Sequence, residues 1–274
     1  MMVKMMGYNV GSCKKILTGR IVISLFFTLL VGICGGLLGI GGGEFRIPIL
    51  LYIVGLPVVQ AVAVNLIIGL LTVSVSLAIR LFFGLICEDI ILPSFVMMIA
   101  SVMGARLGAK LSGKLPEKYL RLFLSVLLIV VGIRLISSAA LRMDSFYFKV
   151  PIVVEMILVA LVGFGIGIIS GMLGVAGGEF RIPAFMYLFG LDIVSSGTAS
   201  LLVSIPTIVS GLEKHNHIGH ISRIHKFIAI LMGLISVAGA MIGAIYASHV
   251  EKSVLEILLG IILILATVII ISKP

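Results

Sequence analysis

A ten-residue stretch that occurs twice constrains this chain more than any other feature. Residues 39–48 read Gly-Ile-Gly-Gly-Gly-Glu-Phe-Arg-Ile-Pro, and residues 174–183, 135 positions later, read Gly-Val-Ala-Gly-Gly-Glu-Phe-Arg-Ile-Pro. The same offset still pairs residues at Gly108-Ala109, which correspond to Gly243-Ala244. Because solenoid repeats have periods of about 20 to 50 residues, a period this long indicates a duplicated half-domain.

The composition predicts that the duplicated unit lies in a lipid bilayer. Hydrophobic residues make up 61% of the 274 residues and charged residues 11%, and the mean hydropathy is +1.33. So few polar side chains do not cover the surface of a water-soluble protein of this size. The net charge is +9, but the basic residues lie in short loops between apolar runs, as in membrane proteins. We therefore expect no nucleic-acid partner.

Apolar runs long enough to cross the bilayer recur along the chain. About 20 helical residues span the hydrocarbon core. Runs of that length cover residues 21–40, 58–79, 90–110, 118–137, 152–173, 193–212, 226–246 and 254–272. We expect each to form a membrane helix. The first run ends without a small-residue cleavage site, so we expect no removable signal peptide.

Each repeat also contains an apolar piece that is too short to cross. The two pieces begin at Pro48 and Pro183 and end at Gly55 and Gly190. At about 1.5 Å per residue, each reaches roughly half way across the bilayer. We therefore predict two half-helices, each with its proline in the first position, where the missing N–H costs nothing.

The distribution of basic residues favours an inverted repeat. If each Gly-rich turn with its half-helix counts as a fifth crossing, the basic N-terminus, residues 106–121 and the 213–226 loop all lie in the cytoplasm. Two copies with an odd number of crossings enter the membrane in opposite senses. The predicted fold is an all-α integral membrane protein with two homologous, inverted repeats, each of four long helices and a half-helix after a Gly-rich turn. The expected organisation is a cytoplasmic N-terminal segment (1–20), membrane repeat 1 (21–138), a linker (139–151) and membrane repeat 2 (152–274).

The Gly-rich turns are the first candidate binding site. Non-helical backbone cannot face lipid, so the turns must be buried in protein or line a cavity. Two inverted copies would bring them near the centre, where the half-helices would direct N–H groups and positive dipole ends at an anion. The candidate residues are Gly41, Gly42, Gly43, Gly177 and Gly178. The alternative is that these glycines only allow close helix packing.

A glutamate and an arginine follow the glycines in both copies. Charges at membrane depth are costly, so Glu44, Arg46, Glu179 and Arg181 should be paired or hydrated there. Each arginine offers a fork of donors suited to an oxyanion, and each glutamate could take up a proton coupled to movement. Equally open is that each Glu-Arg pair is an ion bridge holding its turn at the membrane surface.

Hydroxyl and amide side chains occur in the long run after each half-helix. Asn65 in the first repeat corresponds to Ser200 in the second, and Thr198 lies two residues before Ser200. These three side chains could line one side of a substrate path. For any single Ser or Thr, a hydrogen bond back to its own helix is the simpler explanation.

A histidine-rich stretch, residues 215–225, has spacings that could bring three imidazoles together on zinc. No cysteine accompanies these histidines, and Glu213 is the only carboxylate among them. We therefore favour a polar loop whose histidines titrate near physiological pH. The three cysteines have unrelated spacings and form no metal motif or disulfide framework, so we expect no metal and no cofactor.

The pattern Gly-x-Gly-Gly-Gly-x-x-x-x-Pro, followed after a Gly-Leu by small and hydroxyl residues, resembles the TauE/SafE sulfite exporter family of membrane proteins. The resemblance covers nearly the whole chain, and the second copy departs from it only at Ala176. The family's Thr-Ser element matches best at residues 197–200, whereas residues 62–65 read Val-Ala-Val-Asn. The resemblance implies transport of small sulfur-containing anions, such as sulfite or organosulfonates, across the cytoplasmic membrane.

Residues and resemblance together lead to a hypothesis for function. We expect a secondary transporter, not an enzyme, that holds a small anion between the two Gly-rich turns and exposes it alternately as one repeat rocks against the other. No nucleotide motif is present, so a gradient of protons or another ion would supply the energy. The alternatives are a passive anion channel and, less favoured, a metal-dependent intramembrane enzyme. The direction, the substrate within its class, the coupling ion and homo-oligomer formation are left open.

Overall fold

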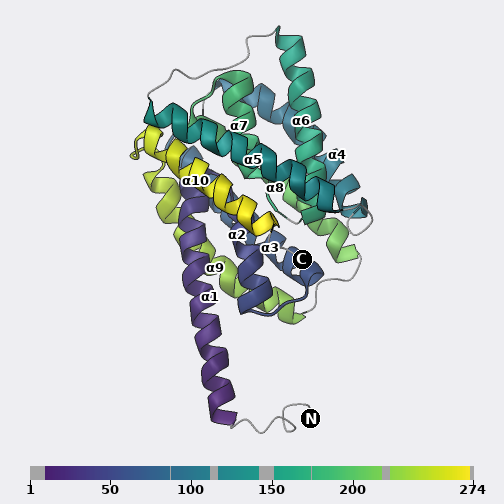
Figure 1. The fold of residues 1–274 in the computed structure, drawn as a ribbon, viewed down its shortest axis with the longest axis vertical. Coiled ribbons are helices and arrows are strands. Elements are labelled where there is room, and N and C mark those ends of the chain that lie inside the picture. The colour runs from purple at the N-terminus through teal and green to yellow at the C-terminus, as the bar shows by residue number, and fades with distance from the viewer. Residues whose placement is uncertain are drawn as a thin grey trace.

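The chain forms a bundle of helices in a computed structural model, which describes residues 10–86, 88–111, 117–141, 151–173, 175–217 and 223–271 (Figure 1). The described residues contain no β-strand. The first repeat has α1 (Val10–Leu38), α2 (Gly43–Pro48), a π-helical segment η2 (Ile49–Ile53), α3 (Val58–Phe82), a 3-10 turn η3 (Glu88–Ile90), α4 (Ile91–Leu111) and α5 (Glu117–Ala140). The second has α6 (Ile152–Leu173), α7 (Gly178–Phe189), α8 (Ile193–His217), α9 (Arg223–Tyr246) and α10 (Lys252–Ile271).

Six of the described helices, α1, α3, α4, α6, α8 and α9, are long and apolar enough to cross a membrane. They match six of the eight expected runs. The other two runs correspond to α5 and α10, whose side chains are described only in part. Large apolar side chains are exposed on these helices, among them Phe26, Met103, Leu161 and Leu234. Such a surface suits lipid better than water, in agreement with an all-α multi-pass membrane protein.

Glycines let helices of one repeat pack directly on helices of the other. A Cβ added to Gly108 of α4 would lie under 3.0 Å from the carbonyl oxygen of Ile168 in α6. One added to Gly243 of α9 would meet Ile33 of α1 in the same way. The 135-residue offset relates these two contacts, so the α4–α6 and α1–α9 crossings are copies of each other. Only glycine allows the helix backbones to approach so closely.

The last helices of the two repeats, α5 and α10, lie side by side and cross at a pair of glycines (Figure 1). A Cβ on Gly132 would lie 2.9 Å from the carbonyl oxygen of Gly260, and a Cβ on Gly260 would lie 2.7 Å from that of Gly132. Each glycine also faces an isoleucine of the other helix, Ile264 and Ile136 respectively. The contact is therefore reciprocal. Gly132 and Gly260 are 128 positions apart in the sequence, whereas the repeated motif has an offset of 135 positions.

The short helices begin earlier than expected. They start at Gly43 and Gly178, so Pro48 and Pro183 lie inside them, and the expectation that each proline occupies the first position is wrong. The residues before the two helices are Gly42 and Gly177, which adopt the left-handed conformation with φ of 70° and 76°. Each Gly-rich turn ends at this glycine, and the helix begins at the next residue. The two glutamates consequently lie in the first helical turn, at the positive end of the dipole.

Asp192 caps the start of α8 with its carboxyl. Oδ1 accepts hydrogen bonds from the backbone N–H groups of Val194 and Ser195 at 2.9 and 3.3 Å. Oδ2 accepts one from the Ser195 hydroxyl at 2.9 Å and lies 3.6 Å from the Lys252 ammonium. Partial burial by itself raises the pKa of Asp192, but the hydrogen bonds and the lysine outweigh burial and hold that pKa below its ordinary value of 3.8.

We expect Asp192→Ala to lower the free energy of unfolding at neutral pH by about 1 kcal/mol, the usual cost of a lost N-cap. Because the folded protein depresses the pKa of this carboxyl, its contribution is present above the unfolded-state pKa and is lost as the pH falls through the folded one. Thermal unfolding in detergent should therefore show that the difference in unfolding temperature between wild type and Asp192→Ala becomes smaller below about pH 4. A gap that stays constant down to that range would contradict the role of the ionised carboxyl.

Candidate functional site

The two Gly-rich turns are buried and in direct contact. Residues 38–44 and 175–183 are all buried. A Cβ added to Gly43 would lie 3.4 Å from the Cα of Val175, and one added to Gly178 would lie 2.6 Å from the Cα of Ile40. The structure thus brings together the glycines that the sequence singled out: Gly41, Gly42, Gly43, Gly177 and Gly178. At Gly178 the turns leave no room between them for a methyl group, whereas a methyl group at Gly43 would be in ordinary contact with Val175.

Arg46 is fully buried behind the first turn, and its hydrogen bonds go to neutral groups. The guanidinium donates to Asn65 Oδ1 at 3.1 Å, Thr72 Oγ1 at 3.5 Å, Ser236 Oγ at 3.0 Å and the Gly41 carbonyl at 2.6 Å. Asn65 in turn donates from Nδ2 to the Gly43 carbonyl at 3.1 Å. Arg46 and Asn65 therefore hold the backbone of the first turn from both ends.

Arg181 is the counterpart of Arg46, and its bonding is less complete. Nη1 donates to the carbonyl of Ala176 and to Ser204 Oγ at 2.9 Å, and Nη2 donates to Thr207 Oγ1 at 3.2 Å. The Nε of Arg181 is buried and has no hydrogen-bond partner, whereas the Nε of Arg46 donates to Asn65. The second turn thus has the same arginine in the same place with one donor unused.

Ser200 explains the unused donor of Arg181. It occupies the position of Asn65, but its side chain is shorter and carries no amide oxygen that could reach Nε. The Ser200 hydroxyl is itself buried without a hydrogen-bond partner. It lies one helical turn before Ser204, on the face of α8 that Arg181 contacts. Two buried donors, the Arg181 Nε–H and the Ser200 O–H, therefore remain at the second turn.

A third buried arginine, Arg80 of α3, was missed by the sequence analysis. Its guanidinium donates to the carbonyls of Gly36 at 3.1 Å, Leu37 at 2.8 Å and Val194 at 2.9 Å, and to Thr198 Oγ1 at 3.2 Å. The structure thus places Thr198 beside Arg80. Arg80 lies against the carbonyl end of α1, where a cation is favourable. The available signal was a single charge at the end of an apolar run, and the expected helix stopped one residue before it.

Glu44 and Glu179 interact with each other across the contact between the repeats. They are only 8% and 2% exposed. Both oxygens of Glu44 and Oε2 of Glu179 find no donor on another residue. No ion pair within 4 Å joins either glutamate to an arginine in the described part of the chain. The surface ion bridge that the sequence left open is therefore not what is observed.

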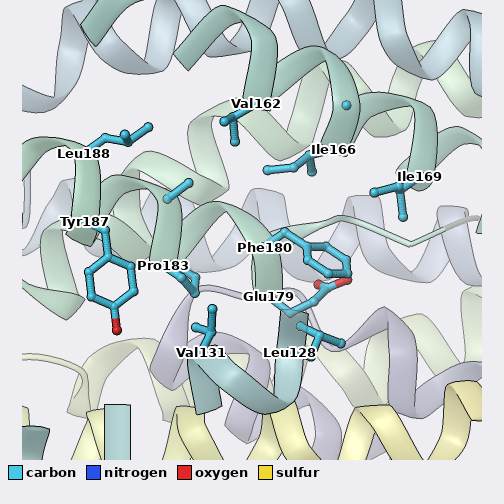
Figure 2. A pocket seen from close by; sticks show the side chains of 12 residues that line it. Leu128, Val131, Val162, Ile166, Ile169, Glu179, Phe180, Pro183, Tyr187 and Leu188 are labelled. Atoms are coloured by element: carbon cyan, nitrogen blue, oxygen red, sulfur yellow. The ribbon is translucent and has the colours of Figure 1, made fainter. Parts of the chain in front are cut away.

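A cavity of about 380 Å³ lies beside Glu179 (Figure 2). Its walls come from α5, α6 and α7, and Glu179 and Tyr187 carry the only polar side chains among the lining residues. Figure 2 shows the apolar side chains, such as Val131, Ile166 and Leu188, that surround them. Because the one charged group in this cavity is a carboxyl, the cavity is unsuited to an anion and gives space beside Glu179 instead.

The histidine-rich stretch lies largely outside the described residues, because the structure leaves out residues 218–222 and the side chains on either side of them. Within the part of the chain that is described, no group of three or more His, Cys, Asp or Glu side chains could hold a metal ion.

Comparison with known proteins gives one match. The family model described as "Sulfite exporter TauE/SafE" matches residues 3–135 and 147–274, so each matched segment covers one of the two repeats. No curated protein and no solved structure matches the chain. The match confirms the resemblance seen in the repeated motif.

Proposed function

Since the chain belongs to the TauE/SafE sulfite exporter family, whose members are membrane transporters, we propose that it is a secondary transporter for a small sulfur-containing anion such as sulfite or an organosulfonate. It acts in the cytoplasmic membrane and carries its substrate by alternating access. The anion binds at the second Gly-rich turn, next to Arg181 and Ser200.

The observation that carries this proposal is the pair of unused donors at the second turn. Leaving a buried donor unsatisfied costs about 1 to 3 kcal/mol, so such groups call for a partner. A sulfur oxyanion can accept a charge-assisted hydrogen bond from the Nε–H of Arg181 and another from the Ser200 hydroxyl.

The balance of buried charge also favours an anion. Among the described residues, Arg46, Arg80 and Arg181 are fully buried, and only Glu44 and Glu179 are buried carboxyls. With all five ionised, the interior carries an excess of one positive charge. An isolated charge in a low-dielectric interior is costly, and an anionic substrate would compensate it.

Alternating access is supported by the reciprocal contacts between the repeats. Two copies related by a twofold axis produce paired contacts of this kind. The pairs are the crossing of α4 with α6 and that of α1 with α9, and the reciprocal glycine contact of α5 with α10. Inverted repeats of this kind hold substrate at the contact between the copies and expose it by moving one copy against the other. A passive anion channel would need a continuous polar path, and the close contact of the two turns argues against one.

The proposal is tested by anion binding to the purified protein in detergent. We expect sulfite, thiosulfate or sulfoacetate, but not chloride at the same concentration, to raise the thermal unfolding temperature. At a concentration 100 times Kd the gain is about 2.7 kcal/mol. Arg181→Ala should remove the gain, and Arg20→Ala, which changes an exposed arginine of α1, should keep it. Stabilisation by none of the sulfur oxyanions, or equal stabilisation of Arg181→Ala, would overturn the proposal.

A further inference from the structure

The interacting pair of Glu44 and Glu179 has no role in the anion site. The two residues come from opposite repeats, occupy equivalent positions and meet where the Gly-rich turns touch. Three of their four carboxyl oxygens are buried without a donor on any other residue. The nearby guanidiniums direct their hydrogen bonds to carbonyls, hydroxyls and an amide instead.

Each carboxyl is buried beside the other and forms no ion pair within 4 Å with a guanidinium in the described part of the chain, so the electrostatic free energy disfavours the state in which both are ionised. A single proton resolves the arrangement, because a protonated carboxyl donates an O–H to its ionised neighbour. This bond would give the pair the donor that the rest of the protein does not supply. We infer that Glu44 and Glu179 together bind one proton, and that this proton is the coupling ion for the anion transport proposed above, on which this inference rests.

The charge of the interior links this proton to the anion. With both carboxyls ionised, the three buried arginines exceed the buried carboxylates by one charge, and with one proton bound they exceed them by two. Proton uptake therefore strengthens anion binding, and by thermodynamic reciprocity anion binding strengthens proton uptake. The two ions are bound together and cross the membrane in the same direction.

The position of the pair explains how movement would release the proton. Glu44 belongs to the first repeat and Glu179 to the second, so a displacement of one repeat against the other separates the carboxyls. Once separated, each carboxyl loses the neighbour with which it shares the proton. The cavity beside Glu179 provides open space next to that carboxyl, so the side chain has room on this side when the repeats move apart.

Few other titratable groups face the pair. Arg46 and Arg181 are on the same short helices, and α1 contributes Cys34, which packs in the cluster that contains Phe180. Tyr187 lies in the cavity, with Arg134 of α5 and Glu256 of α10 near its hydroxyl. Arg80 of α3 is buried against the end of α1. Among the described residues, none of these groups adds a third carboxyl to the contact of the turns.

The inference is tested by counting protons during anion binding. Methanesulfonate is a suitable probe, because its sulfonate stays ionised throughout the neutral range. Isothermal titration in buffers of different ionisation enthalpy, at a pH above that at which the anion-free protein loses the proton of the pair, should show uptake of up to one proton per anion. Where uptake is complete, Kd should fall about tenfold for each unit decrease in pH. Glu179→Gln and the double variant with Glu44→Gln should bind the anion without proton uptake and with a Kd independent of pH. Glu155→Gln, which changes a carboxyl of α6 outside the site, should behave as wild type.

A second readout does not need the anion. Infrared spectra of the wild-type protein at neutral pH should show the C=O band of a protonated carboxyl, and the double variant should lack this band. Absence of the band in wild type, or proton uptake that is unchanged in the glutamine variants, would overturn the inference. A wild-type protein that shows the band but binds none of the sulfur anions would overturn the proposed function and leave the proton site standing.

Discussion

Replacing Ser200 by Asn is expected to weaken anion binding roughly 100-fold without unfolding the protein. In the first repeat, Asn65 accepts a hydrogen bond from the Nε of Arg46 and donates one to the Gly43 carbonyl. Ser200→Asn would supply the same amide at the second turn and use the free donor of Arg181. Loss of two hydrogen bonds to the anion, each worth about 1.5 kcal/mol or more, should weaken binding roughly 100-fold. The protein without anion should become about 1 kcal/mol more stable.

The measurement is titration calorimetry with a sulfur oxyanion, together with thermal unfolding in its absence. Asn65→Ser is the matched reverse change. It should leave the Nε of Arg46 unpaired and lower the free energy of unfolding by about 1 to 3 kcal/mol. If Ser200→Asn binds the anion as tightly as wild type, the second turn is not the binding site, whatever the stability of the variant.

Replacing Gly108 or Gly243 by Ala is expected to be the most destabilising Gly→Ala change among the described glycines. At either position the new Cβ would lie well under 3.0 Å from a backbone carbonyl of the neighbouring helix. A backbone atom cannot move aside as a side chain can, so the helices must separate, at a cost of about 3 kcal/mol or more. Thermal unfolding in detergent should show a large decrease in unfolding temperature for each variant.

Gly165→Ala is the control for this loss. Gly165 lies in α6, the same helix that Gly108 contacts, but no atom lies within 4 Å of a Cβ built there. That change should be neutral, or stabilising by up to about 1 kcal/mol through the better helix propensity of Ala. If Gly108→Ala were as well tolerated as Gly165→Ala, the close crossing of α4 and α6 would be wrong.

The sequence alone was sufficient for the architecture at low resolution. Apolar runs of about 20 residues can only be helices in a bilayer, because the backbone must satisfy its own hydrogen bonds there. The repeated motif located the two turns, and the Asn65 and Ser200 difference was visible in the alignment of the copies. The first residues of the short helices were misplaced, because a proline rule was applied where left-handed glycines decide the boundary.

Which side chains meet was decided only by the tertiary structure. That Glu44 interacts with Glu179, or that Arg80 donates a hydrogen bond to Thr198, depends on how helices far apart in the chain cross, and no local sequence pattern contains that information. The Nε of Arg181 likewise lacks a partner because the Ser200 side chain is too short to reach it, and this depends on where α8 lies relative to α7. The sequence therefore determined the elements and their duplication, because hydrophobicity and glycine content act locally. The tertiary structure decided the buried hydrogen bonds and charge contacts, because these depend on packing to within a fraction of an ångström.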